Sequence, residues 1–229
     1  MSEKSISFLL LSGGVGTRVG HCEPKQFCEI RGMEMMAWSL RLADAHPRIG
    51  EIVTNAPEGF RERTRELCAR HAPNTNIRIG PCGVTRQESV KILLSMTDCD
   101  IVVLHEAARP LIDREMLDLL IDDSSENAGY YAPVPFSLCE IDGATGMVGR
   151  NIPRHNVVNI QLPQKFPRLS LLRAHQLAAA RGIAFTEDSL LLKEMLGVTI
   201  KPLPGPAKNI KVTTPEDIEI ASVLLERNA

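Results

Sequence analysis

The chain has 229 residues, a length that suits one large domain with a sizeable core better than two small ones. Its content of 44% hydrophobic and 24% charged residues is that of an ordinary globular protein. The formal net charge of -2 excludes a general nucleic-acid-binding protein, which needs a basic surface, but leaves room for a local basic cleft.

The predicted elements alternate between apolar runs and amphipathic stretches along the chain. Strands are predicted at Ser5–Leu11, Glu51–Asn55, Ile77–Gly80, Ile101–His105, Tyr130–Val134 and Val198–Pro202. Helices are predicted at Met35–Ala45, Phe60–His71, Thr85–Met96, Arg114–Asp122, Arg168–Ala180 and Pro215–Arg227. This order predicts an α/β fold with a Rossmann-like, mostly parallel sheet flanked by helices. Ligands in such folds bind beyond the carboxyl ends of the strands.

The first predicted strand runs straight into a glycine-rich loop, Ser12–Arg18, and Pro24-Lys25-Gln26 follows shortly after. Glycine allows positive φ and close backbone approach, and consecutive N–H groups can form a concave anion site. No Gly-Lys-Ser/Thr follows, so the loop is not a Walker A motif, and it lacks the third small residue of a dinucleotide fingerprint. A simple glycine turn is the alternative interpretation. Arg18 and Lys25 favour a phosphate-handling site instead, because a bare turn has no need of their charge.

Residues 138–158 interrupt the α/β rhythm with short segments and an Asp142-Gly143 turn signal. We expect a β-hairpin arm that projects from a single domain covering residues 1–229 and packs on a second subunit as a homodimer. The N-terminal apolar run is too short to cross a membrane and has no cleavage-site pattern. Six cysteines without a C-x-x-C pair favour free thiols in a reducing cytoplasm.

Six motifs occur in an order that is typical of a known enzyme family. They are the Ser12–Arg18 loop, Pro24–Phe27, Gly83–Val90, His105–Pro110, Pro163-Gln164 and Asn209–Thr213. With these motifs the chain resembles, over almost its whole length, the cytidylyltransferases that make CDP-linked polyols. The methylerythritol phosphate and ribitol phosphate enzymes are the two nearest groups. The resemblance implies that CTP donates CMP to a phosphorylated acceptor, with release of pyrophosphate.

The resemblance also assigns residues to the reaction. Arg18, Lys25 and Lys211 would be catalytic, since phosphoryl-type transfer depends on positioning and charge neutralisation. The implied nucleotide-binding residues are Ser12, Gly13, Gly14, Gly16, Gly83, Ser89 and Ala107. Three of these residues also have an ordinary structural interpretation. Lys25 could be a solvated loop lysine, Lys211 a strand-edge lysine, and Ser89 a helix-surface serine.

The resemblance implies Mg²⁺ as cofactor, with Glu106 as its ligand. The family usually has aspartate there, and the longer side chain makes a strand-end acid with no ligand role the alternative. Arg109 and Arg154 would contact the acceptor phosphate, Arg154 from across a dimer interface, unless they are a surface-paired and a solvated arginine. Ser137 and Leu162 would also face the acceptor.

The acceptor side departs from the usual pattern of the methylerythritol phosphate enzymes. Phe136 stands in place of a carboxylate and Leu162 in place of a hydroxyl. Losing such donors is expected to change substrate or affinity. Three alternatives therefore stay open: a phosphonate or other non-polyol acceptor, a CTP-binding protein without turnover, and a nucleotidyltransferase that uses another NTP.

Overall fold

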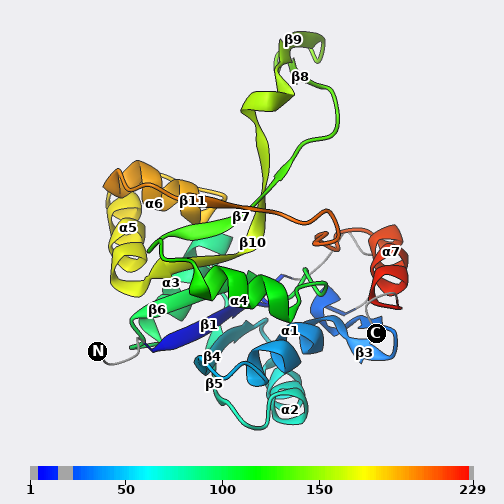
Figure 1. Ribbon diagram of the computed structural model, residues 1–229, viewed down its shortest axis with the longest axis vertical. Helices are drawn as coiled ribbons and strands as arrows, with labels where there is room; N and C mark the ends of the chain where they lie inside the picture. The colour runs from blue at the N-terminus through cyan, green and yellow to red at the C-terminus, as the bar shows by residue number, and fades with distance from the viewer. Residues whose placement is uncertain (1–4, 15–22, 227–229) are drawn as a thin grey trace.

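A computed structural model describes residues 5–14 and 23–226 of the chain. Its centre is a seven-stranded sheet with the order β11-β7-β10-β6-β1-β4-β5 (Figure 1). The predicted strands are present as β1 (Ile6–Leu11), β4 (Ile49–Ala56), β5 (Asn76–Pro81), β6 (Ile101–Glu106), β7 (Ala128–Pro133) and β11 (Lys201–Pro204). The added strand, β10 (Val158–Pro167), runs antiparallel to both of its neighbours, while the other pairs are parallel. The mostly parallel α/β prediction is therefore confirmed.

Helices cover both faces of the sheet, as the sequence predicts. On one face pack α1 (Met35–Asp44), α2 (Arg61–His71) and α4 (Arg114–Asp122). On the other pack α3 (Arg86–Ser95), α5 (Arg168–Ala180) and α6 (Asp188–Leu196). Strand β1 serves both layers, because alternate side chains point to opposite faces: Phe8 and Leu10 enter one core cluster and Leu9 the other.

The C-terminal helix α7 (Pro215–Glu226) packs apart from these two layers. With Ala221 it buries a third, smaller cluster that includes Ile30 of β2 (Glu29–Ile30) and Met35. The short β3 (Met33–Glu34) pairs with β2, and the 3-10 turn η2 (Lys25–Phe27) precedes them. Helix α7 is thereby held beside the segment that carries Lys25 (Figure 1).

The longest elements that were not predicted are β10 and α6, and one predicted strand was misplaced. Strand β10 carries two prolines and buried polar side chains, so its sequence lacks the apolar pattern by which a central strand is predicted. Lys165, for example, donates to the carbonyl of Asp123 at 2.6 Å, beyond the end of α4. Helix α6 was missed although Gly197, at φ 68°, marks its end. The strand predicted at Val198–Pro202 begins at Lys201, because Val198 and Ile200 pack against the α5–α6 side before pairing starts.

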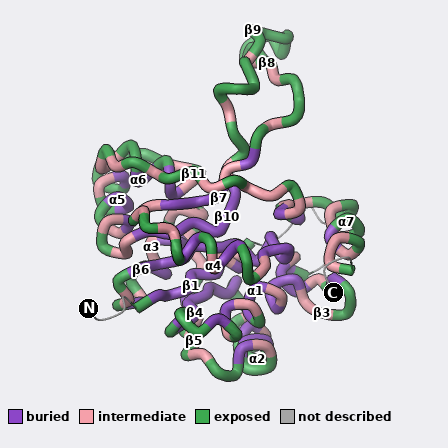
Figure 2. The backbone as a smooth tube through the Cα atoms, viewed as in Figure 1, coloured by how far each residue is buried: buried purple, intermediate pink, exposed green. Residues whose placement is uncertain are grey.

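The predicted hairpin is present as β8 (Leu138–Ile141) and β9 (Val148–Ile152), which pair antiparallel and stand away from the sheet (Figure 1). The turn between them is organised by Asp142, whose carboxylate accepts hydrogen bonds from Ala144 and Thr145. The 3-10 turn η3 (Arg154–Asn156) leads back to β10. Figure 2 shows the arm almost wholly exposed, in contrast to the buried sheet. Its role in dimerisation stays a prediction.

Candidate active site

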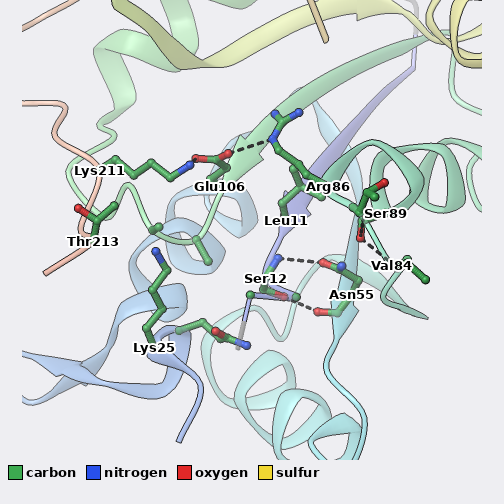
Figure 3. A pocket seen from close by; sticks show the side chains of 17 residues that line it. Leu11, Ser12, Lys25, Asn55, Val84, Arg86, Ser89, Glu106, Lys211 and Thr213 are labelled. Carbon is green, nitrogen blue, oxygen red and sulfur yellow. Dashed lines mark hydrogen bonds and ion pairs between the residues drawn. The ribbon is translucent and has the colours of Figure 1, made fainter. Parts of the chain in front are cut away.

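A cavity of about 470 Å³ opens beyond the carboxyl ends of β1, β4 and β6. This is the place that parallel sheets offer to ligands. Its lining residues are Leu11, Ser12, Gly13, Gly14, Lys25, Gln26, Asn55, Gly83, Val84, Thr85, Arg86, Ser89, Glu106, Ala107, Ala108, Lys211 and Thr213. Figure 3 shows Lys25, Lys211 and Thr213 on one side of the cavity, with Asn55, Val84 and Ser89 on the other.

The start of the glycine loop is anchored to β4. The backbone N–H of Ser12 donates to Asn55 Oδ1 at 2.8 Å, and its hydroxyl contacts the Thr54 hydroxyl at 2.9 Å. A Cβ at Gly13 would lie 2.5 Å from the Cys82 sulfur and 2.6 Å from Asn55 Nδ2, so a larger residue there would force the loop or these side chains to shift. Gly14 lines the cavity, and a Cβ there would meet no described atom within 4 Å. Gly16 and Arg18 lie outside the described residues.

The loop 83–85 is held by the first turns of α3. The Ser89 hydroxyl accepts from the Gly83 N–H at 3.0 Å and donates to the Thr85 carbonyl at 3.0 Å. Thr85 and Glu88 form a capping box that closes the helix N-terminus. A hydroxyl has one donor and two acceptor lone pairs, so Ser89 keeps one lone pair for a ligand donor. Ser89 therefore supports the loop and still faces the cavity.

The two described cations predicted to be catalytic come from opposite ends of the chain. Lys25 Nζ donates to the Val212 carbonyl at 2.9 Å, next to Lys211 in sequence. Lys211 Nζ lies 2.8 Å from Glu106 Oε2. The structure thus brings Lys25 and Lys211 to one cavity, together with Ala107 at its wall.

Glu106 is buried at the end of β6 and meets several cations. Its Oε1 accepts from Arg86 Nε at 3.2 Å, and Arg109 Nε lies 3.9 Å from Oε2. Burial alone would raise the pKa of Glu106, but Lys211 and Arg86 outweigh it and lower the pKa to about 2. The carboxylate is therefore ionised in the site at any ordinary pH.

This arrangement does not fit a metal ligand at Glu106. Each of its oxygens already lies beside a cationic nitrogen, and a divalent ion there would face the charges of Arg86 and Lys211. Over residues 5–14 and 23–226, no group of three or more His, Cys, Asp or Glu side chains could hold a metal ion. We derive no step through a metal for this chain.

The four residues predicted to bind the acceptor do not gather at the cavity within one chain. Arg109 is buried and donates to the carbonyls of Asn209, at 2.8 Å, and Ile160, at 3.4 Å. Leu162 is 1% exposed and belongs to the core, because its backbone turns inward at the bulge in β10. Ser137 and Arg154 are exposed, and Arg154 donates only to the Pro135 carbonyl among the contacts described.

Sequence reasoning missed Asn55, Arg86, Glu187 and Asp188. Asn55 fixes Ser12, and Arg86 connects Glu106 to Asp188 of α6, with Nη1 2.6 Å from Asp188 Oδ2. Arg86 lies between Gly83 and Ser89, inside the motif Gly83–Val90. Its positive charge at that place could have marked it as a site residue. Nothing in the sequence pairs position 86 with position 188.

An α/β sheet with a glycine loop, two lysines and a buried carboxylate at its ligand edge defines a nucleotidyltransferase type of site. The IspD family model, 2-C-methyl-D-erythritol 4-phosphate cytidylyltransferase, matches residues 6–227. The chain therefore belongs to the 2-C-methyl-D-erythritol 4-phosphate cytidylyltransferase family and is a CTP-dependent nucleotidyltransferase.

Individual relatives agree with this assignment. The enzyme of that name from Solibacter usitatus (strain Ellin6076) is 32% identical over 98% of this chain and 97% of its own length. The enzyme from Deinococcus radiodurans is 35% identical over 94% of this chain and 88% of its own length.

Solved structures agree as well. The crystal structure of the enzyme from Thermus thermophilus has a TM-score of 0.77 at 27% identity and covers 95% of this chain and 98% of its own. The 4-diphosphocytidyl-2C-methyl-D-erythritol synthase from Anaerococcus prevotii has a TM-score of 0.84 over 98% and 97% of the two chains. At 24% identity it supports the fold alone.

Proposed function

We propose that the chain transfers CMP from CTP to 2-C-methyl-D-erythritol 4-phosphate. A phosphate oxygen of the acceptor forms a bond to the α-phosphorus of CTP, the bond from that phosphorus to the bridging oxygen breaks, and pyrophosphate leaves with the electron pair. The observation that carries the proposal is the convergence of Lys25 and Lys211 on the cavity that Ser89 also lines. The acceptor is taken from the relatives, which are 2-C-methyl-D-erythritol 4-phosphate cytidylyltransferases.

The lysines would neutralise charge as it redistributes between the attacking oxygen, the phosphorus and the leaving pyrophosphate. Arg18 would add to them from the glycine loop. Such a reaction needs little covalent participation by the protein, and depends on positioning and on cations held in place before the reaction. Lys25 enters from η2 and Lys211 from the segment before α7, and the Lys25–Val212 hydrogen bond joins the two segments, so both lysines would face the polyphosphate from the same side of the cavity (Figure 3).

The base would be read at the other side of the cavity. The remaining lone pair of the Ser89 hydroxyl suits the exocyclic amine of cytosine, which is a donor, and would disfavour the carbonyl that uracil presents at the same place. Gly83 allows the backbone of this loop to lie close to α3: a Cβ there would lie 2.7 Å from the Ser89 nitrogen. This geometry supports CTP rather than UTP.

The acceptor half would be completed by a second copy of the chain. The arm exposes Ile141, Met147 and Val148 by 60% or more, and a two-stranded hairpin has no core of its own to hide them. A homodimer would cover these side chains and could bring Arg154 and Ser137 of one copy toward the cavity of the other. This accounts for their distance from the cavity within one chain.

Magnesium, in this proposal, would enter already bound to the triphosphate. Mg²⁺ commonly takes substrate phosphates as ligands and needs few from protein. The chain is proposed to act in the cytoplasm. No helix among residues 5–14 and 23–226 has the length and apolar character needed to cross a membrane.

The test is pyrophosphate release with CTP and a panel of acceptors: methylerythritol 4-phosphate, ribitol 5-phosphate and a phosphonate analogue. We expect the first to give the highest kcat/KM. Preference for the phosphonate would replace the proposed acceptor, in line with Phe136 in place of a carboxylate. CTP binding without turnover on any acceptor would overturn the proposal. Competition by ATP, GTP and UTP for the CTP site would check the nucleotide.

A further inference from the structure

A continuous line of charged contacts runs from the buried face of α5 to the cavity. His175 Nε2 lies 2.9 Å from Asp188 Oδ1, and Asp188 Oδ2 accepts from Arg86 Nη1 at 2.6 Å. Arg86 Nε donates to Glu106 Oε1 at 3.2 Å, and Glu106 Oε2 lies 2.8 Å from Lys211 Nζ. Figure 3 shows its last three members, Arg86, Glu106 and Lys211, at the cavity.

Each of the five residues in this line lies on a different part of the fold. His175 is on α5, Asp188 begins α6, Arg86 begins α3, Glu106 ends β6, and Lys211 lies in the segment before α7. The line therefore ties together five parts of the fold that are distant in sequence.

The end of the line away from the cavity is fully buried, whereas the end at the cavity is partly exposed. The side chain of Lys211 is 42% exposed, those of Glu106 and Arg86 are 8% and 25% exposed, and those of Asp188 and His175 are at most 1% exposed. Burial alone would raise the pKa of Asp188, but Arg86 and His175 lower it overall. Asp188 is thus an ionised acceptor for Arg86, and His175 Nε2 lies within hydrogen-bond distance of its other oxygen.

Stability alone is a weak reason for this arrangement. A buried ion pair costs desolvation that its attraction repays only in part, and apolar replacements are often as stable. The line ends on a partly exposed lysine with a flexible four-carbon stem in a segment without regular structure. Such a side chain loses much conformational freedom when it must stay in one place.

We propose that Asp188 and His175 are positioning residues that act through Arg86 and Glu106 on Lys211, so that the ammonium is held ready for the polyphosphate. The idea rests on the proposed function, in which Lys211 neutralises charge at the phosphates. Glu106 then serves as the anion that orients two cations rather than as a metal ligand. Its carboxylate keeps Lys211 at the cavity wall before the nucleotide arrives.

The test is a double-mutant cycle between Asp188→Asn and Lys211→Ala, read by kcat with CTP and acceptor and by the Kd of CTP from calorimetry. In the otherwise native chain, Asp188→Asn is expected to lower kcat about tenfold, because a misplacement of about 1 Å can cost more than that. In the Lys211→Ala background the same change should alter kcat and Kd less than about twofold, since coupled residues are not additive.

Two further comparisons distinguish the proposed positioning role from a purely structural role. His175→Gln retains an N–H donor toward Asp188 and should keep near-native kcat, whereas His175→Leu should reproduce part of the loss. Asp122→Asn, which breaks an exposed pair with Arg48, is the matched control and should leave kcat and Kd unchanged. Thermal unfolding of every variant shows the temperature range in which all are folded.

An equal loss from Asp188→Asn in both backgrounds would overturn the proposal, because the effect would then not pass through Lys211. The same conclusion would follow if His175→Gln and His175→Leu behaved alike. Absence of turnover in the native enzyme would instead refute the proposed function, and the Kd cycle would still decide whether Asp188 acts on Lys211.

Discussion

Lys25 Nζ donates a hydrogen bond of 2.9 Å to the carbonyl of Val212, which joins two segments 187 residues apart. This contact sets Lys25 beside the backbone that carries Lys211. The cationic side of the cavity is therefore formed by two segments that are distant in sequence. One is the 3-10 turn η2 near the N-terminus, and the other is the segment that precedes α7. Its chemistry depends on both being in place.

The first prediction concerns the two lysines. Lys25→Ala and Lys211→Ala should each lower kcat roughly a hundredfold, as expected when one donor is removed from a preorganised site. Circular dichroism and thermal unfolding should show that both variants fold. Lys201→Ala, at an exposed position on β11, is the control and should keep native kcat. Near-native turnover in either cavity variant would remove its assigned role.

A second prediction concerns Ser89, whose hydroxyl accepts a hydrogen bond from the Gly83 N–H and donates one to the Thr85 carbonyl. Ser89→Ala should raise the KM for CTP several-fold, because the loop loses its support and the base loses an acceptor. Stability should fall by about 1 kcal/mol, the usual value of a hydrogen bond. The control is Ser95→Ala at the exposed end of the same helix. An unchanged KM for CTP would exclude Ser89 from base binding.

The third prediction concerns Gly13, whose missing side chain makes room for Cys82 and Asn55. A Cβ would lie 2.5 Å from Cys82 Sγ and 2.6 Å from Asn55 Nδ2. Gly13→Ala should therefore shift the loop and weaken CTP binding, measured by calorimetry, by about tenfold or more. Gly50→Ala, where the nearest atom is at 3.8 Å, should not. Equal affinities in the two variants would show that the close approach is not required.

A fourth prediction concerns pH. Burial raises the pKa of Glu187 to about 7 from an ordinary 4.5, with Arg86 opposing the shift. The folded state therefore holds a proton that the unfolded chain releases, so the contribution of Glu187 to stability should fall as the pH rises from about 4.5 through 7. The loss from this group is about 3 kcal/mol. His105, whose pKa burial lowers to about 4, contributes in the opposite sense over much of the same range.

Chemical denaturation across that pH range measures the effect. Glu187→Gln stays neutral and should gain stability relative to the native chain as the pH rises, whereas Glu194→Gln on the exposed side of α6 should follow the native curve. A pH curve of Glu187→Gln that runs parallel to the native one would show that Glu187 does not titrate in this range.

The fifth prediction concerns the arm. Replacing Ile141 and Val148 by serine should weaken self-association in sedimentation velocity, since these side chains are 60% and 74% exposed and have apolar surface to bury. Acceptor-dependent turnover should fall with the dimer fraction, while CTP binding should remain. Ile220→Ser, at a 49% exposed position on α7, is the control. A native chain that is monomeric at all concentrations would contradict the proposed dimer.

Much of the fold could be predicted because local patterns carry it. The buried run Ile6–Leu11 and its glycine loop, the Thr85–Glu88 capping box and the Asp142-Gly143 turn each act over a few residues. Strand β10 could not be predicted in the same way. Its buried Gln164 and Lys165 donate to backbone carbonyls that only the folded chain brings within reach.

The sequence by itself determined the family, the parallel sheet and the phosphate-handling residue types, because short motifs and hydrophobic periodicity are local properties. Tertiary structure decided which of those residues meet. It joined Lys25 to the segment of Lys211 and turned Leu162 into the core. It also connected Glu106 through Arg86 to an aspartate that no motif singled out. The physical reason is that charge pairing depends on distance in space, and a buried carboxylate takes its role from the cations that the fold brings to it.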